Sequence, residues 1–157
     1  MYKRILVATD GSKLSMMAVE HAINLADLDS ATLSTATVSL TGGFVTGQDV
    51  LSFTNAGVAT MGNITGSYNT TTGVMSLISS GNSATKAQWE TALRAVAYNN
   101  TSDNPTTAAR TVSYVVNDGA LNSNAVTSTV NVSAANDAPL LNNSLTLALP
   151  DLMEGSA

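Results

Sequence analysis

The sequence lacks most of the residues on which catalytic and metal chemistry commonly depends. It has no cysteine among its 157 residues, so it can form no disulfide, no thiolate nucleophile and no cysteine-based zinc site. Its one histidine is His21, and no Gly-x-Ser-x-Gly nucleophile elbow occurs. No apolar run approaches the roughly 18 residues that a membrane span needs. These absences predict a protein that is not an enzyme and that does not span a membrane.

Charged and aromatic residues are also scarce, at 11% and 4% of the chain. The core must therefore come from Val, Leu, Ile and Ala, and the polar surface from Thr, Ser and Asn, which are typical of strands and turns. The net charge is −5; residues 1–26 contribute +1, and the chain from Asp27 onward contributes −6. An acidic chain of this kind is an unlikely partner for nucleic acid and is well suited to divalent cations.

Residues 1–26 predict a β-α unit, in which "YKRILVATDGS" is a strand that ends at a turn and Ser15 caps a helix. The unit resembles the opening of universal stress proteins, whose chains begin with a basic-then-aliphatic strand, a DGS turn and a helix of this kind. The resemblance implies a parallel α/β sheet and an adenine nucleotide beside Asp10. The glycine-spaced phosphate loop of that family has no counterpart here, which favours a fused leader. Because this stretch is not a signal peptide, we expect any export signal to lie outside this chain.

From about Leu25 onward the apolar residues recur at every second position instead of at helical spacing. Alternation of this kind, with turn residues between the segments, predicts the strands of a sandwich. About seven strands are expected, at residues 30–33, 36–40, 49–53, 62–68, 73–79, 111–119 and 125–133.

One segment departs from the alternation and predicts a short helix over residues 85–93. Thr85 and Gln88 have the spacing of a capping box, and Trp89, Leu93 and Val96 share a helical face before the chain enters a strand through Tyr98. We expect Trp89 to plug an open edge of the sandwich, since large aromatic side chains are mostly buried. The alternative is an exposed tryptophan that stacks on carbohydrate.

The segment "VNDGALNSNAVTSTVNVSAANDAP" resembles the end of a cadherin domain, with an Asp-Gly turn before the last strand and an Asn-Asp-x-Pro junction after it. The whole stretch of residues 27–139 resembles the cadherin-like repeats found in tandem in large bacterial surface adhesins. The resemblance implies an all-β, Ig/cadherin-like antiparallel sandwich that is extracellular or at the cell surface. It also implies neighbouring repeats or identical subunits as partners, together with a surface ligand that the sequence does not identify.

Acidic and amide side chains cluster at the predicted turns, where they could supply the six to eight oxygens that calcium prefers. The resemblance implies that such ligands stiffen the junctions between repeats. The alternative is that these residues only make Asx turns and caps. The candidate calcium ligands are Asp27, Asp29, Asp103, Asp118, Asn136 and Asp137.

Residues 140–157 look like the first strand of a following repeat. Leu145, Leu147 and Leu149 alternate with smaller or polar residues before Pro150, which ends the strand. A complete repeat of this kind would start with such a strand, and here residues 1–26 occupy its place. We therefore expect residues 143–149 to fill an edge of the sandwich, in the same chain or in a neighbouring copy, and the second case would build filaments.

The sequence thus predicts three segments, namely a leader over residues 1–26, a sandwich repeat over 27–139 and the start of another repeat over 140–157. The expected function is that of a non-enzymatic adhesin or structural module, stiffened by calcium. The alternative is a cytosolic adenine-nucleotide-binding protein of the universal stress type, which residues 1–26 favour.

Overall fold

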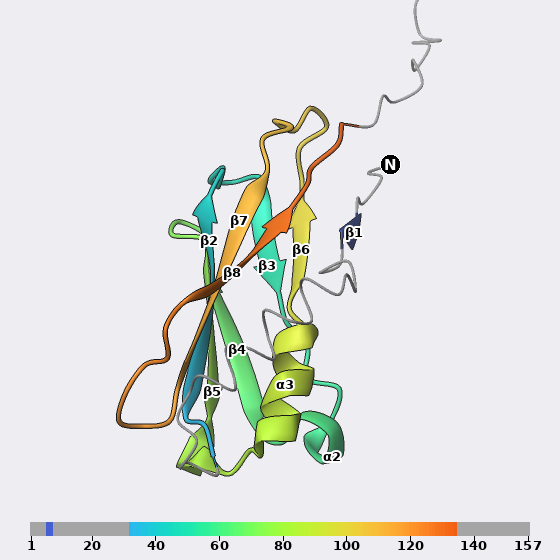
Figure 1. The fold of residues 1–157 in the computed structure, drawn as a ribbon. Helices are drawn as coiled ribbons and strands as arrows, with labels where there is room; N and C mark the ends of the chain where they lie inside the picture. The colour runs from blue at the N-terminus through green and yellow to red at the C-terminus, as the bar shows by residue number, and fades with distance from the viewer. Residues whose placement is uncertain (1–5, 8–31, 135–157) are drawn as a thin grey trace, which may run out of the picture.

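The computed structural model describes residues 6–7 and 32–134 (Figure 1). Its first part carries the short strand β1 (Leu6–Val7), the strands β2 (Thr35–Gly42) and β3 (Asp49–Ser52), and the one-turn helix α2 (Val58–Met61). The hairpin strands β4 (Ile64–Asn69) and β5 (Val74–Ser79) lead to a 3-10 turn at Ser80–Asn82 and the helix α3 (Lys86–Arg94). The last strands are β6 (Ala97–Asn100), β7 (Arg110–Asn117) and β8 (Val126–Val130).

The strands form two antiparallel sheets, which confirms the predicted sandwich-like fold. One sheet has the order β4-β5-β2-β7-β8, and the other has the order β1-β6-β3. The central strand β2 is hydrogen-bonded to β5 on one side and to β7 on the other, so its backbone is fully used in the sheet. Figure 1 shows the five-stranded sheet beside the smaller sheet, with α3 at one end.

The core lies between the sheets because the strands alternate as the sequence predicts. In β2 the side chains of Ala36, Val38 and Leu40 are buried, while the threonines and the serine between them face outward. Leu51 and Tyr98 come from the smaller sheet and join the same apolar cluster. With so few aromatic residues, this core is built mainly of aliphatic side chains, as the composition predicts.

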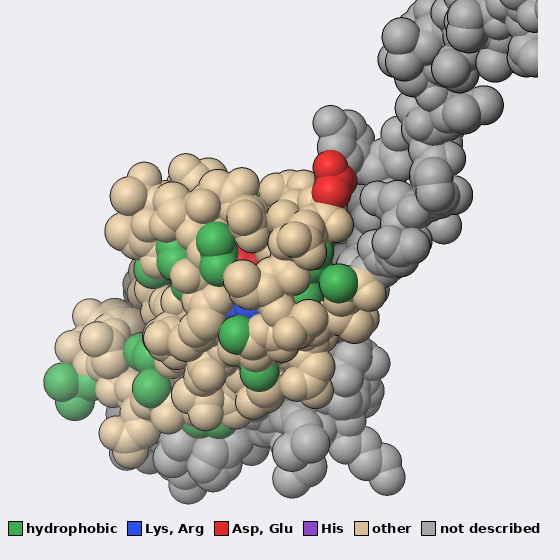
Figure 2. Space-filling view, turned by 90° about the horizontal axis from the view of Figure 1, so that it is seen from above, with side chains coloured by type: hydrophobic (Ala, Val, Ile, Leu, Met, Phe, Trp, Pro, Cys, Tyr) green, Lys and Arg blue, Asp and Glu red, His purple; other side chains and the backbone are tan. Residues whose placement is uncertain are grey.

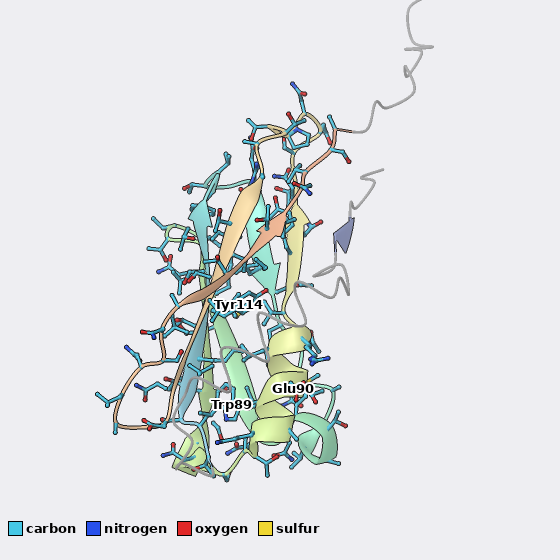
Figure 3. All side chains as sticks on the ribbon, in the orientation of Figure 1. Trp89, Glu90 and Tyr114 are labelled. Carbon is cyan, nitrogen blue, oxygen red and sulfur yellow. The ribbon has the colours of Figure 1, made fainter. Side chains whose placement is uncertain are left out.

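Helix α3 begins where the capping box predicts. The Thr85 side chain accepts a hydrogen bond from the Gln88 backbone N–H, and the Gln88 side chain accepts one from the Thr85 N–H. Trp89, labelled in Figure 3, is 0% exposed. Its indole N–H donates to the Leu33 carbonyl oxygen. The prediction of a buried anchor is confirmed, and the exposed carbohydrate-stacking alternative is wrong.

The structure differs from the sequence prediction in three places. Of the strand expected at residues 30–33, the structure describes residues 32 and 33, which form only an isolated bridge between Thr32 and Thr85. The short helix α2 was not predicted, since four residues carry too little periodicity to identify a helix. The strand of the leader, β1, pairs antiparallel with β6, whereas the stress-protein resemblance implied a parallel sheet.

The remainder of the leader and residues 135–157 lie outside the described residues, as does the prediction that residues 143–149 fill an edge. In the part of the chain that the structure describes, no helix is long and apolar enough to cross a membrane.

Candidate functional site

The predicted calcium ligands that the structure describes lie at opposite ends of one strand. Asp103 is in the loop that leads into β7, and Asp118 follows directly after β7. A strand of eight residues spans roughly 26 Å, so these two carboxylates cannot bind the same ion. Within residues 32–134, no group of three or more His, Asp or Glu side chains is placed to hold a metal. The other four candidates, Asp27, Asp29, Asn136 and Asp137, lie outside the described residues.

Asp118 organises the hairpin between β7 and β8. Its Oδ1 atom accepts hydrogen bonds from the backbone N–H groups of Ala120 at 2.7 Å and Leu121 at 2.9 Å. These two bonds hold the pKa of Asp118 below its usual value, and the bond from Leu121 has the larger effect. The next residue, Gly119, has a φ of +106° that favours glycine. The Asx-turn alternative therefore accounts for the position of Asp118 without a metal.

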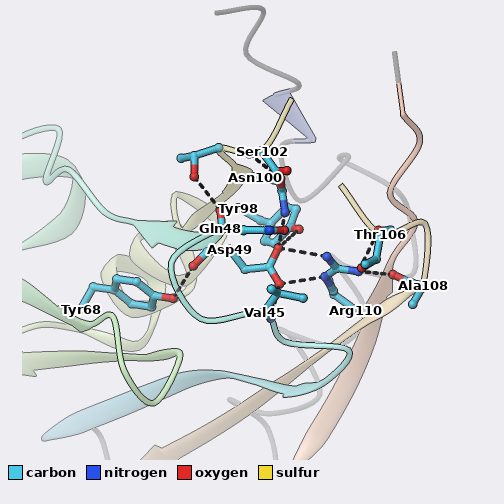
Figure 4. A network of polar contacts seen from close by, with 11 residues as sticks. Val45, Gln48, Asp49, Tyr68, Tyr98, Asn100, Ser102, Thr106, Ala108 and Arg110 are labelled. Atoms are coloured by element: carbon cyan, nitrogen blue, oxygen red, sulfur yellow. Dashed lines mark hydrogen bonds and ion pairs between the residues drawn. The ribbon is translucent and has the colours of Figure 1, made fainter. Parts of the chain in front are cut away.

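The most highly organised polar group in the described chain is a buried ion pair between the two sheets. Asp49 is the first residue of β3 and Arg110 is the first residue of β7. The guanidinium donates from Nε to Asp49 Oδ2 at 2.9 Å and from Nη2 to Asp49 Oδ1 at 3.3 Å (Figure 4). Both side chains are 0% exposed. A pair in this position joins the larger sheet to the smaller one.

Further donors surround the Asp49 carboxylate. Oδ1 accepts the hydroxyl of Tyr98 at 2.5 Å and the amide of Asn100 at 2.6 Å, both from β6. Oδ2 accepts the backbone N–H of Val45 at 2.7 Å. Five donors thus share the roughly four lone-pair sites of the carboxylate, which leaves no open position for a substrate or an ion.

The guanidinium of Arg110 is satisfied as well. Its Nη1 donates to the carbonyl oxygens of Thr106 and Ala108, both in the loop before β7. This loop is therefore fixed by the same side chain that joins the sheets. A buried charge is costly unless it is paired and fully hydrogen-bonded, and both conditions are met here.

The environment shifts the protonation equilibria of this group. Burial by itself would raise the pKa of Asp49, but the hydrogen bonds from Arg110, Tyr98, Val45 and Asn100 outweigh it and lower that pKa below its usual value. Burial, followed by the hydrogen bond to Asp49, raises the pKa of Tyr98 to about 12. For Arg110, burial opposes the charge while the bond to Asp49 favours it, and its pKa is raised. The ionised pair is thus the stable form over the physiological pH range.

Sequence reasoning did not single out this pair, although the sequence contains a signal for it. Asp49 is in phase with Leu51 and Phe53, and Arg110 is in phase with Val112 and Tyr114, so both charges fall on inward-facing positions. Two opposite charges in phase with the core sides of two strands predict a buried ion pair.

The outer surface around this network is poor in charge. Figure 2, viewed from above, shows mainly backbone and uncharged polar atoms, with few charged side chains. The candidate ligand Asp103 lies in the loop before β7, and its side chain is exposed.

Comparison with known proteins gives one partial match. The model of the universal stress protein family matches residues 1–49. This is less than a third of the 157 residues. No curated protein and no solved structure matches the chain.

The universal stress protein match ends within the sandwich. It covers β1 and β2 and stops at Asp49, yet β1 is antiparallel to β6 and β2 is antiparallel to both of its neighbours. These described strands of the matched region therefore belong to antiparallel sheets, in contrast to the parallel sheet that the resemblance implied.

Proposed function

We propose that this chain is a non-enzymatic module of an extracellular adhesion or structural protein, a repeat that joins its neighbours end to end. One observation carries the proposal: the part of the sandwich from β2 to β8 begins at one end and finishes at the other, while β1 pairs with β6 at the end where β8 leaves (Figure 1). The Ser34 N–H donates to the Asn117 carbonyl oxygen at 2.8 Å, so β2 starts beside the last residue of β7. Val130, the last residue of β8, faces Arg110, the first residue of β7.

We call the end of the sandwich with Ser34 and the β7–β8 hairpin the hairpin end. The opposite end, with Arg110 and Val130, is the Arg110 end. The length of β7 separates them by roughly 26 Å. Repeats that each run from β2 to β8 can follow one another along their length, which is the arrangement that a tandem surface repeat requires.

The proposal predicts the shape of a tandem. Two full chains joined in series should have a maximum dimension, measured by small-angle X-ray scattering, that exceeds that of one chain by about the length of a module. A joined pair that scatters as a compact particle, with little gain in maximum dimension, contradicts end-to-end stacking.

Calcium at the junctions is the second part of the proposal. By position in the chain, the candidate ligands fall into two sets. Asp27 and Asp29 precede β2 and would join Asp118 at the hairpin end. Asn136 and Asp137 follow β8 and would join Asp103 at the Arg110 end. Each set offers oxygen ligands of the kind that calcium prefers.

Thermal unfolding tests the calcium sites, because an ion that binds only the folded state raises the melting temperature. We expect a rise at millimolar calcium that magnesium does not reproduce and that a chelator reverses. Asp118→Asn and Asp103→Asn should each reduce the rise, and Glu90→Gln, which removes an exposed acid in α3, should leave it unchanged. If calcium does not move the melting temperature, the metal part is wrong and the scattering experiment still decides the module.

The family match over residues 1–49 favours a second candidate function, an adenine-nucleotide-binding protein of the universal stress type. The resemblance puts Asp10 beside the nucleotide. Isothermal titration of the full chain with ATP tests this function, and Asp10→Ala is the matched variant. A heat of ATP binding that is seen with the parent chain and disappears in the Asp10→Ala variant supports this function. If the parent chain gives no heat of binding, this function is excluded.

A further inference from the structure

The smaller sheet has one strand whose outer side is paired over only part of its length. Strand β6 contains four residues, and β1 pairs with only two of them, Tyr98 and Asn99. On its other side β6 pairs with β3 over all four residues. Strand β3, at the opposite edge, is bonded to the larger sheet, because the Tyr68 hydroxyl of β4 donates to the Asp49 carbonyl oxygen at 3.0 Å. The outer side of β6 is therefore the edge at which the smaller sheet can accept a strand.

The Asn99 side chain has an unmet hydrogen bond at this edge. Its Oδ1 atom is buried and accepts no hydrogen bond within the part of the chain that the structure describes. The residue paired with it in β1 is Leu6, a residue type without a side-chain donor. Because a buried polar atom without a partner is unfavourable, this edge favours a strand that offers a hydroxyl group opposite Asn99.

The chain leaves the sandwich next to this edge. Val130 ends β8 opposite Arg110, which is bonded to Asp49. Asp49 is in turn paired with Asn100, the last residue of β6. Figure 1 shows β1 beside β6 at this same end of the sandwich. A segment that follows β8 therefore starts close to the edge that β1 occupies.

The direction of a returning chain also fits. Strand β6 ends at the Arg110 end, so a chain that turns back from this end runs antiparallel to β6, as β1 does. Residues 131–142 separate β8 from the predicted C-terminal strand over residues 143–149. Fully extended they reach about 40 Å, which exceeds the roughly 10 Å between packed sheets and leaves enough chain for a turn.

One register suits both faces of β6. Every second residue over 96–100 is buried, and the residues between them are half-buried. With Thr146 opposite Asn99, the Thr146 hydroxyl can donate to the unmet oxygen. The same register puts the three leucines of the C-terminal strand opposite the three buried residues. These pairs are Leu145 with Asn100, Leu147 with Tyr98 and Leu149 with Val96.

The C-terminal strand also has the more apolar pattern of the two segments. In the leader, the positions in phase with Val7 are Ile5 and Thr9, whereas positions 145, 147 and 149 are all leucine. One leucine thus stands in place of a threonine. Burying one leucine side chain changes an equilibrium by about a factor of ten or more. Residues 143–149 should therefore hold the edge more strongly than β1 does.

We propose that residues 143–149 of the same chain compete with β1 for the outer edge of β6 and bind there with Thr146 opposite Asn99. The C-terminal strand then extends the smaller sheet at the end where the chain leaves it, and β1 is released from β6. The exchange requires neither calcium nor the proposed adhesion function.

Because the chain has no cysteine, a disulfide can report which residue lies opposite position 99. The full-length triple variant Leu6→Cys, Asn99→Cys and Thr146→Cys offers position 99 two partners at the distance that a disulfide needs. The variant is oxidised at low protein concentration and digested, and mass spectrometry identifies the linked peptides. We expect the 99–146 link within one chain about tenfold more often than the 6–99 link.

A double variant that is out of register is the matched control. In Asn99→Cys with Ala148→Cys, the two positions share a face but lie diagonally, roughly 7–8 Å apart, which is too far for an unstrained disulfide. This variant should link much more slowly than Asn99→Cys with Thr146→Cys. A predominant 6–99 link, or equal linking in the two double variants, overturns the proposal. Links between two chains would assign residues 143–149 to a neighbouring copy and would overturn it as well.

A second pair of variants keeps the test open if Asn99→Cys fails to fold. Leu147→Asp puts a charge against the buried side chain of Tyr98, whereas Ala148→Asp puts the same charge on the outer side of the sheet. Because the loss of Leu147 removes the tenfold preference for the C-terminal strand, we expect Leu147→Asp to melt about 4 °C lower than Ala148→Asp. Equal melting temperatures in the two variants contradict the proposed register.

Discussion

The indole N–H of Trp89 donates a hydrogen bond of 2.9 Å to the carbonyl oxygen of Leu33, 56 positions earlier in the chain. Leu33 lies two residues before the start of β2, and both Leu33 and Trp89 are 0% exposed. Helix α3 therefore fixes the point at which the chain enters the central strand of the larger sheet. The bond also satisfies a buried carbonyl that has no place in the β2 ladder.

Replacing this tryptophan tests the value of the bond. Trp89→Phe keeps an aromatic ring but leaves the Leu33 carbonyl without its donor, and an unsatisfied buried group costs about 1–3 kcal/mol. Urea unfolding followed by circular dichroism measures the loss. Ser83→Ala is the control, since it removes a hydrogen bond to the Ser80 carbonyl at an exposed site, where water can replace it. Equal losses in the two variants would contradict a special role for Trp89.

Removing one charge of the buried pair should be among the most damaging single changes. Asp49→Asn keeps the shape of the side chain but leaves the Arg110 guanidinium buried without a counter-charge, which typically costs about 3–5 kcal/mol. The free energy of unfolding in urea measures the effect. Glu90→Gln removes the exposed pair with Arg94 and should cost less than about 1 kcal/mol. A small loss in Asp49→Asn would show that the pair contributes little to stability.

The pair should also make the stability of the fold fall at acid pH. Because the pKa of Asp49 is lower in the folded state than in the unfolded chain, its contribution is present above the unfolded value of about 3.9 and is lost as the pH falls through the lowered pKa. The melting temperature should therefore decline below about pH 4. In Asp118→Asn, which removes an exposed carboxylate of lowered pKa, most of this decline should persist.

An alkaline limit follows from Tyr98. Its pKa of about 12 lies above the unfolded value of about 10, so its contribution is complete below about pH 10 and is lost as the pH rises toward 12. The loss amounts to at most about 3 kcal/mol. Melting curves between pH 9 and 12 should show this decline, and Tyr98→Phe should flatten it. A decline of the same size in Tyr98→Phe would assign it to other groups.

The capping box of α3 offers a local test. Thr85→Ala removes the acceptor for the Gln88 N–H and should cost about 1 kcal/mol of stability. Thr91→Ala makes the same chemical change within the helix, where the hydroxyl bonds back to the Ala87 carbonyl, and should be close to neutral. Thermal unfolding of both variants under one condition makes the comparison, and a neutral Thr85→Ala would contradict the role of the cap.

The strands, the helix and its buried tryptophan could be predicted because their information is local. Alternation in β2 and β7, the Asn69–Gly73 turn between β4 and β5, and the Thr85–Gln88 capping box are each contained in a few consecutive residues. The short helix α2 and the bridge at Thr32 depend on tertiary contacts and carry no such period.

The candidate site could be predicted only in part. Acidic turns stand out in the sequence and predict ligands at Asp103 and Asp118, which stays a prediction, but they do not point to the Asp49–Arg110 pair. Those two residues are 61 positions apart, and neither is unusual until the strands that carry them are known to face each other. The periodicity shows that each points inward, but which strands meet is a property of the fold.

The antiparallel placement of β2 has a consequence for how genes of this kind can be rearranged. The stretch that matches universal stress proteins ends at Asp49, the residue that neutralises Arg110. A recombination crossover at that boundary would remove the middle strand of the larger sheet and would leave an arginine buried without its counter-ion. An exchange of the leader that preserves the larger sheet and the buried ion pair must therefore cross over before Thr32.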